Sequence, residues 1–151
     1  MNYNAPSLTS MFSWQGDTAL WSKLLIVGAF AVLFILYAAA IVKRKSLDDR
    51  VLLAFAVLIA VAIPFILPHM HDRYFYPAGI LLVILFISDP RYFAAPLFAE
   101  LASLHCYYAY FARRYLVDPR YGGLLMLLVL LMCVLFLSCE IKKSGKLKNN
   151  P

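Results

Sequence analysis

The chain has 151 residues, of which 64% are hydrophobic and 15% are charged, and its formal net charge is +6. Its mean hydropathy is +0.78, whereas a soluble globular domain is only about half apolar. A soluble helical bundle would need a polar face on each helix, and the apolar runs of this chain have none. The basic excess does not indicate nucleic-acid binding, because no folded basic domain accompanies it.

Residues 1–22 are of mixed polarity and precede the first apolar run. The segment has no basic stretch followed by a short apolar core, so we do not expect it to be a signal peptide. Its aromatic residues include Trp14 and Trp21, and tryptophan favours the boundary between membrane and water. We therefore predict an extracytoplasmic or interfacial segment that leads into the first span.

Five apolar blocks follow, which predict an all-α membrane protein with about five transmembrane helices. A helix needs roughly 20 apolar residues to cross a bilayer and satisfies its own backbone hydrogen bonds there. The third block is short, and we expect it to be extended by its aromatic flank or to be tucked against its neighbours. The five blocks are residues 24–42, 51–67, 75–88, 93–111 and 122–139.

The basic residues predict the orientation of these spans. With five spans, nine lysines and arginines fall on the side of the C-terminus and five on the side of the N-terminus. Positive residues collect on the cytoplasmic side, so we expect the N-terminus outside and residues 141–151 to be a basic cytoplasmic tail. No linker interrupts the chain, which predicts a single transmembrane domain over residues 1–151.

The stretch "LPHMHDRYFYPAG" at residues 67–79 is unusually polar for a membrane chain. An ordinary aromatic belt explains its tyrosines. A short polar turn explains the cluster of His69, His71, Asp72 and Arg73 less well, because any polar residues would serve in such a turn. The next outer connection carries Arg113, Arg114 and Arg120. Arginine binds phosphate oxygens with a planar fork of donors. A site for an anionic head group and a solvated loop both remain open.

"MHDRYFY" at 70–76 resembles the "MHERYF" type motif of bacterial GT-C glycosyltransferases, which are polyprenyl-phosphate-dependent, mannosyltransferase-like membrane enzymes. Three further stretches are similar to the same family in the same order. They are "NAPS" at 4–7, "ASLHCYYAYF" at 102–111 and "RYLVDPRYGGLL" at 114–125. The resemblance covers nearly the whole chain but only the last part of the family's length.

The resemblance implies transfer of a mannose-type sugar from a polyprenyl-phosphate carrier to an acceptor outside a bacterial plasma membrane. The matching site positions are His71, Asp72, Arg73 and Tyr74. Arg73 would pair with the carrier phosphate or with an acid that shapes the site, and His71 would donate to the same oxygens. Two positions depart from the family. Asp72 stands where a Glu is usual, and Gly79 stands where an acid is expected.

The family's catalytic acid lies in its first outer loop, and no part of this chain resembles that loop. A general base must lie within hydrogen-bond reach of the acceptor hydroxyl, and the outer acids Asp17, Asp72 and Asp118 lie in other segments. We therefore assign no catalytic residue and expect the C-terminal part of a longer enzyme, inactive without an N-terminal partner chain. The expected partners are membrane lipid and the polyprenyl-phosphate carrier, which brings the donor sugar.

Metal and thiol chemistry receive little support from the sequence. Cys106, Cys133 and Cys139 have no zinc-type spacing, so no metal ligand is assigned, and the need for a divalent cation stays open. Glu100 and His105 lie within the fourth block, five residues apart, and so do not share a helix face. We expect Glu100 to be neutral and hydrogen-bonded to a neighbouring helix, in preference to a proton relay.

The alternative function is a small non-enzymatic membrane protein that binds a lipid carrier, assists assembly or resembles a transporter. Transporters usually carry broken or repeated spans with polar groups near the middle of the membrane. Only Pro64 and Glu100 hint at such a pattern.

Overall fold

The computed structural model describes residues 5–12, 17–43, 47–114 and 116–149. Helices make up 85% of the structure, and the described part contains no strand. This confirms the all-α fold class. Several positions used in the sequence analysis lie outside the described residues. They are Asn4, Trp14, Arg44, Lys45 and Tyr115, together with residues 1–3, 13, 15–16, 46 and 150–151.

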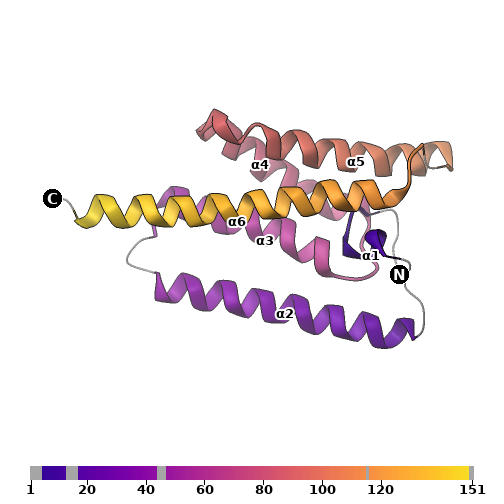
Figure 1. Cartoon of the computed structure of the whole chain (residues 1–151), viewed down its shortest axis with the longest axis horizontal. Helices are drawn as coiled ribbons and strands as arrows, with labels where there is room; N and C mark the ends of the chain where they lie inside the picture. The colour runs from indigo at the N-terminus through magenta and orange to yellow at the C-terminus, as the bar shows by residue number, and fades with distance from the viewer. Residues whose placement is uncertain (1–4, 13–16, 44–46, 115, 150–151) are drawn as a thin grey trace.

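The helices run back and forth along one axis (Figure 1). At one end α3 finishes, the 3₁₀ helix η2 turns the chain, α5 finishes and α6 begins; we call this the η2 end. At the other end α2 finishes, α3 begins and α6 finishes; we call this the opposite end. The elements are α1 (Leu8–Met11), α2 (Thr18–Val42), α3 (Asp49–Ile66), η2 (Asp72–Phe75), α4 (Tyr76–Ser88), the 3₁₀ helix η3 (Pro90–Tyr92), α5 (Ala94–Ala112) and α6 (Pro119–Asn149).

Aspartates mark the starts of the long helices. The Asp17 carboxylate accepts from the backbone N–H groups of Ala19 and Leu20 at 2.8 and 3.2 Å. Asp48 accepts from the Val51 N–H at 2.9 Å, just before α3. Asp118 precedes α6 and accepts from the Arg120 N–H at 2.9 Å. These carboxylates satisfy N–H groups that have no partner within the first turn of the helix.

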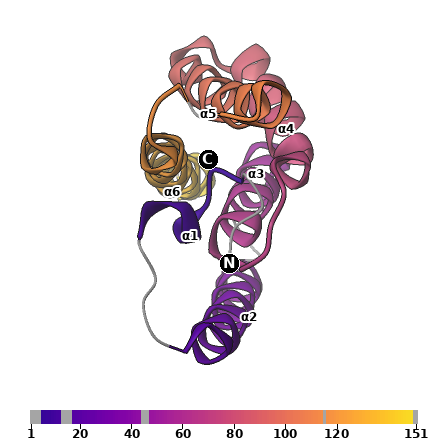
Figure 2. The ribbon, with the colours of Figure 1, turned by 90° about the vertical axis from the view of Figure 1, so that its right-hand side faces the viewer.

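The core forms where α3 and α5 pack against α6 (Figure 2). The buried side chains of α6 recur at helical spacing, at Met126, Val129, Cys133 and Phe136. Small residues let helix backbones approach closely in membranes, and α5 presents such a set. Its buried residues are Ala95, Pro96, Ala99, Ala102, Cys106 and Ala109. In contrast, α2 lies at the edge of the bundle, contacts chiefly α3, and buries only Ala29.

The N-terminal segment is packed into the bundle at residues 5–11. Ala5, Ser7 and Thr9 are buried, and α1 contacts α6 and α3. The close approach depends on Gly123, because a Cβ atom there would lie 2.5 Å from Met11 Cγ and 2.6 Å from Ser10 Oγ. We expected this segment to be extracytoplasmic or interfacial, and the structure adds that residues 5–11 pack against α6 and α3.

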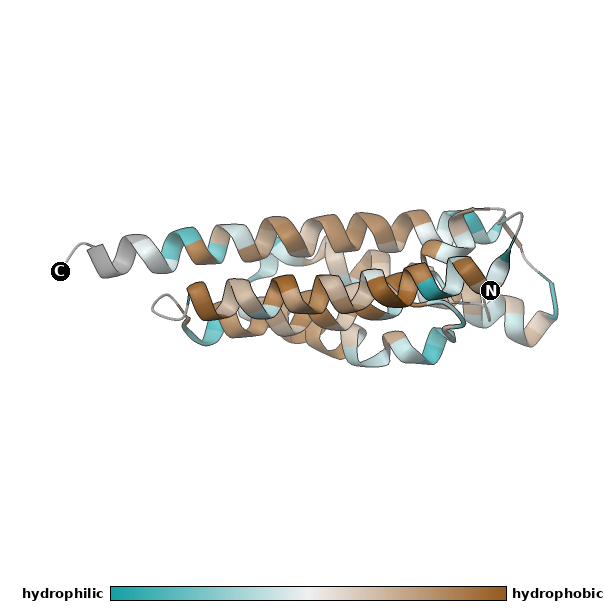
Figure 3. Ribbon diagram, turned by 90° about the horizontal axis from the view of Figure 1, so that it is seen from below, coloured by the Kyte–Doolittle hydropathy of each residue, from teal (hydrophilic) through white to brown (hydrophobic). Residues whose placement is uncertain are grey.

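Three helices are long and apolar enough to cross a membrane, namely α2, α3 and α6. The middle of each of these helices is hydrophobic, and hydrophilic residues lie toward the helix ends (Figure 3). The other two expected spans differ. With 13 residues, α4 covers about 20 Å, and α5 is long enough but is less apolar because it carries Glu100, His105 and several tyrosines. The membrane character of the fold therefore stands on three helices.

Candidate functional site

The polar stretch between α3 and α4 folds into η2 and its flanks. His71 precedes η2 in an extended conformation, and its carbonyl accepts from the Tyr74 N–H at 3.1 Å. The Asp72 carboxylate accepts from the Arg73 N–H at 2.9 Å. Phe75 is buried and anchors the turn, while Arg73 and Tyr74 are exposed. The fold therefore fixes this turn at one end and presents its charged and aromatic groups at the surface.

Arg73 lies over the ring of Tyr74, with Cζ 5.8 Å from the ring centroid. The His71 and Tyr74 rings are 6.2 Å apart and tilted by 43°. An arginine within about 6 Å of an aromatic face gains a cation–π attraction. This contact holds the guanidinium beside the turn and leaves it exposed at the η2 end.

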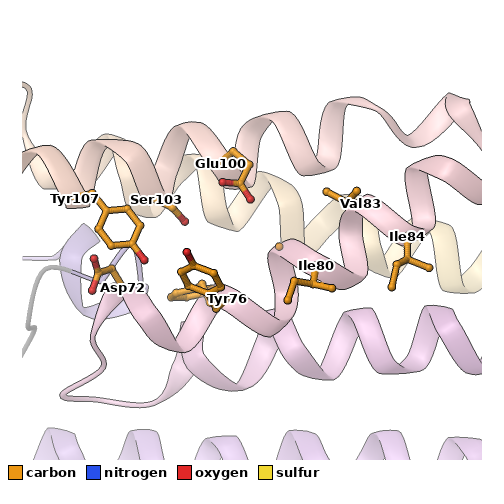
Figure 4. A pocket seen from close by; sticks show the side chains of 10 residues that line it. Asp72, Tyr76, Ile80, Val83, Ile84, Glu100, Ser103 and Tyr107 are labelled. Atoms are coloured by element: carbon orange, nitrogen blue, oxygen red, sulfur yellow. The ribbon is translucent and has the colours of Figure 1, made fainter.

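A groove of about 340 Å³ lies between α4 and α5, next to this turn. Figure 4 shows its polar side chains reaching in from both helices and from η2. On α5, Glu100, Ser103 and Tyr107 line it; their spacing of three and then four residues places them on one face of the helix. The remaining lining residues are Asp72, Phe75, Tyr76, Gly79, Ile80, Val83 and Ile84.

The groove is polar at one end and apolar at the other. The polar lining residues near the η2 end are Asp72, Tyr76, Ser103 and Tyr107. The side chain of Glu100 points from α5 toward α4 (Figure 4). Beyond Glu100 the lining residues are aliphatic. Several of these side chains are exposed, including Tyr76 at 65% and Ile80 at 58%, so the groove opens sideways onto the surface of the molecule.

Glu100 occupies the space above Gly79. A Cβ atom at residue 79 would lie 2.9 Å from Glu100 Oε1, which is closer than the carboxylate could remain. Glycine here therefore lets the carboxylate of α5 approach the backbone of α4. The resemblance led us to expect an acid at position 79, where this chain has glycine. In the structure the space beside Gly79 is filled by the carboxylate of Glu100 from α5.

The structure brings together some of the six expected site residues. Asp72 lines the groove. His71, Arg73 and Tyr74 are next to Asp72 on the same turn but do not line the groove. Arg113 and Arg114 lie on a different element, after α5, where both are exposed at the η2 end. Arg113 ends α5 in the left-handed conformation, with φ 51°. Neither arginine lines the groove.

Sequence reasoning missed Ser103, Tyr76 and Gly79 as site residues and did not assign Glu100 to a site. It compared Glu100 with His105, which lies on another side of α5, 3.4 Å from the position of a Cβ at Gly122. The useful signal was the spacing of Glu100, Ser103 and Tyr107, which marks one polar face. Among the described residues no group of three or more histidine, cysteine or acidic side chains is placed to hold a metal ion.

A second polar cluster lies at the connection between α4 and α5. Asp89 accepts from the backbone N–H of Arg91 at 3.1 Å and forms an ion pair with its guanidinium. The hydrogen bond from Arg91 holds the pKa of the Asp89 carboxyl well below its usual value. Tyr92 packs edge-on against Phe136 of α6, with ring centroids 4.3 Å apart. This cluster ties the connection to the far part of α6.

Comparisons with protein-family models, curated proteins and solved structures find no match to this chain. The site is therefore interpreted from its own geometry and from the residues described above.

Proposed function

We propose that the chain is a multi-pass protein of a bacterial plasma membrane that crosses the bilayer five times. Support for two crossings by α4 and α5 comes from Tyr92, in the connection between them. Tyr92 contacts Phe136, which lies about 25 Å along α6 from Pro119. A hydrocarbon core is about 30 Å thick. The connection between α4 and α5 thus reaches nearly as deep as a full crossing.

The charges support an external N-terminus and a cytoplasmic C-terminus. Nine lysines and arginines of the sequence fall on the side of the C-terminus and five on the side of the N-terminus, and positive residues collect on the cytoplasmic side. Five of the nine are exposed in the described part of the chain. They are Lys43, Arg50, Arg91, Lys142 and Lys143. The η2 end, with Arg73, would then face outward.

At that outer end we propose a binding site for a polyprenyl-phosphate carrier. The observation that carries the proposal is the groove between α4 and α5, whose aliphatic half is suited to an isoprenoid chain. Its polar mouth adjoins Arg73, which is exposed and held in place over Tyr74. Arginine matches phosphate oxygens with its fork of donors. Arg113 and Arg114 add positive charge at the same end.

We further propose that the chain serves as the carrier-binding portion of a glycosyltransferase of mannose type. This step rests on the resemblance of "MHDRYFY" to the family motif, whereas carrier binding also has the groove to support it. The second candidate is a carrier-binding subunit without transfer chemistry. Turnover distinguishes the two, because binding needs no general base and transfer does.

The test is capture of polyprenyl phosphate by the purified chain in lipid nanodiscs, with transfer assayed in parallel. We expect capture by the wild type without turnover unless the rest of the enzyme is supplied. Arg73→Ala should weaken capture by roughly tenfold or more, since a hydrogen bond to a charged group is lost. Arg73→Lys should not restore it, because lysine lacks the planar fork. Arg113→Ala should weaken capture to a smaller extent, since Arg113 follows α5, whereas Arg73 lies on the turn that carries the groove residues Asp72 and Phe75.

Arg50→Ala is the matched control. Arg50 is also an exposed arginine, but it lies at the opposite end, at the start of α3, so its loss should leave capture unchanged. Capture that is unaffected by both Arg73→Ala and Arg113→Ala would overturn the carrier site. Turnover by the chain alone would instead contradict the assignment of a non-catalytic portion.

A further inference from the structure

Two ion pairs near the end of α6 expose their bases and bury their acids. Arg91 pairs with Asp89, and their side chains are 69% and 12% exposed. Lys143 pairs with Glu140, and their side chains are 44% and 4% exposed. In each pair the carboxylate lies inside, and part of the surface of the cation stays uncovered. The acids therefore hold two bases in place without covering them.

The two pairs belong to one cluster, although they come from different parts of the chain. The pKa of Asp89 is held well below its usual range by the hydrogen bond from Arg91 and also by the charge of Lys143 on α6. Tyr92, next to Arg91, packs against Phe136 of α6, and Lys143 follows Phe136 by about two helical turns, on the same side of α6. The charges of Arg91 and Lys143 also act on each other. The fold thus brings two like charges together.

Lys142 adds a third base, at the end of an exposed leucine face of α6. Leu128, Leu131 and Leu135 are exposed, as is Lys142. Successive separations of three, four and seven residues place all four on one face of the helix. In the described part of the chain Lys142 forms no ion pair. The cluster of Asp89, Arg91, Glu140, Lys142 and Lys143 therefore has three bases and two acids, and its net charge is positive.

Bases at the end of an apolar face match the two parts of an anionic phospholipid. The helix α6 is long and apolar enough to cross a membrane, and its apolar block ends at Cys139, just before these lysines. Leu131 lies about 17 Å along α6 from Lys142, which is close to the half-thickness of about 15 Å of a hydrocarbon core. An acyl chain of one leaflet therefore fits beside the leucines. Lysines and arginines next to a span attract anionic head groups.

We propose that Arg91, Lys142 and Lys143 form a binding site for an anionic phospholipid, whose acyl chains lie along the exposed leucines of α6. Asp89 and Glu140 position two of these bases and balance two of the three positive charges. The phosphodiester of the lipid balances the third. This site requires α6 to span the membrane, but it does not depend on the carrier site at the η2 end.

The test is thermal unfolding of the full chain in neutral detergent with added phosphatidylglycerol or phosphatidylcholine of the same acyl chains. A ligand that binds only the folded state raises the unfolding midpoint according to its affinity and concentration. We expect phosphatidylglycerol to raise the midpoint at concentrations at which phosphatidylcholine does not, and we expect salt to weaken the effect. Inorganic phosphate should have no effect, because it lacks acyl chains. Stabilisation by inorganic phosphate alone would overturn the lipid site.

Three variants test which bases bind the lipid. Lys142→Gln should weaken the apparent affinity for phosphatidylglycerol about fivefold, as expected for one base at a membrane surface. Lys23→Gln is the matched control, because Lys23 is an exposed lysine near the start of α2, at the η2 end; it removes the same charge and should leave the affinity unchanged. The double variant Asp89→Asn/Arg91→Gln keeps the net charge of the chain and should weaken the affinity about as much as Lys142→Gln. Helical content and the midpoint without lipid show whether each variant is folded.

Equal effects of the two phospholipids on the wild type would overturn the inference. An equal loss in Lys23→Gln and Lys142→Gln would also overturn it, because the lipid would then respond to net charge alone. Unchanged affinity in both Lys142→Gln and the double variant would reject the site as well. A midpoint raised more by poly-glutamate than by phosphatidylglycerol would identify an acidic protein segment as the occupant in place of the lipid.

The carrier proposal is tested separately by the same variants. Arg73→Ala should leave the affinity for phosphatidylglycerol unchanged, and Lys142→Gln should leave capture of polyprenyl phosphate unchanged. Loss of phosphatidylglycerol binding in Arg73→Ala would place the phospholipid at the η2 end and reject the site on α6. A chain that captures no polyprenyl phosphate but still prefers phosphatidylglycerol through Lys142 would retain this site and reject the carrier.

Discussion

At the scale of single residues, the ion pair of Asp89 and Arg91 shows how one side chain serves two purposes. The carboxylate accepts from the Arg91 backbone N–H at the start of η3 and from the guanidinium of the same residue. The backbone contact fixes the turn, and the charged contact neutralises both groups at the connection between α4 and α5. The pKa of Asp89 is lowered chiefly by the hydrogen bond from the Arg91 side chain.

Asp89→Asn should retain the backbone contact and lose the charged one. A carboxyl whose pKa is lowered in the folded state adds stability above its unfolded pKa of about 3.9, and that stability is lost as the pH falls toward the folded value. We therefore expect the variant to be slightly less stable than wild type at pH 7, with the difference shrinking below about pH 4. Thermal unfolding in detergent from pH 7 to pH 3 measures it. A difference that is constant across this range would show that the charged contact adds no stability.

Also at this scale, the sequence reveals residue types more readily than their partners. Asp72 and Arg73 attract attention because they interrupt an apolar chain, and the structure places both at the η2 end. Glu100 attracts attention for the same reason, but its partner position is Gly79. A sequence pattern does not show that the missing side chain of Gly79 leaves room for the carboxylate of Glu100. That pairing becomes visible only when α4 and α5 are placed side by side.

At the scale of elements, the position of α1 depends on Gly123 of α6, because a side chain there would occupy the space that α1 fills. Four residues are too few for a stable helix in isolation, so α1 is held by what it packs against. The buried Thr9 of α1 hydrogen-bonds the buried Ser7, which precedes the helix, and their hydroxyl oxygens lie 2.9 Å apart. Gly123 lets this segment lie directly against the backbone of α6.

Gly123→Ala should therefore destabilise the protein, although alanine is the better helix former. The added methyl group would lie 2.5 Å from Met11 Cγ, 2.6 Å from Ser10 Oγ and 3.1 Å from the Ser7 carbonyl oxygen. Overpacking of a well-filled site costs typically 1–3 kcal/mol, and we expect a loss of about that size in the free energy of unfolding. Reversible unfolding in mixed micelles provides the measurement.

Gly28→Ala serves as the control, because the same change in α2 meets open space. It should leave stability unchanged or raise it. Equal stability of Gly123→Ala and wild type would mean that α1 moves aside at no cost, and the segment would then be loosely held against α6.

The elements themselves were predictable to different degrees. The runs that became α2, α3 and α6 are long and uniformly apolar, and hydropathy alone finds them. The third block was expected to be short, and α4 is indeed a helix of 13 residues. The burial of residues 5–11 was not predicted, because their mixed polarity suits an interface as well as a packed cleft. Hydropathy indicates how apolar a segment is, but it does not indicate which helices the segment packs against.

At the scale of the whole molecule, the number of crossings and the orientation are separate questions. If α4 and α5 do not cross, the chain crosses three times, and if they do it crosses five times. Both numbers are odd, so the two termini lie on opposite sides in either arrangement. The connection at residues 89–93 is the segment whose location differs. With five crossings it lies on the same side of the membrane as the C-terminus, and with three it lies within the membrane or on the opposite side.

Cysteine labelling decides this point in a variant with Cys106, Cys133 and Cys139 replaced by alanine. Single cysteines would be introduced at three exposed positions: Leu116 before α6, Phe93 after η3, and Lys142 near the end of α6. With an impermeant maleimide on intact cells, we expect Leu116→Cys to react. Phe93→Cys and Lys142→Cys should react only after the membrane is permeabilised.

The reason to expect five crossings is the depth at which the connection is held. Tyr92 contacts Phe136, and Lys142 lies only six residues further along α6, about 9 Å. The exposed guanidinium of Arg91 is thus near the depth of the basic residues Lys142 and Lys143, where water or lipid head groups can solvate it. Phe93→Cys that reacts in intact cells would place α4 and α5 outside. Phe93→Cys that fails to react even after permeabilisation would leave the connection within the hydrocarbon, and the groove would then belong to a re-entrant hairpin.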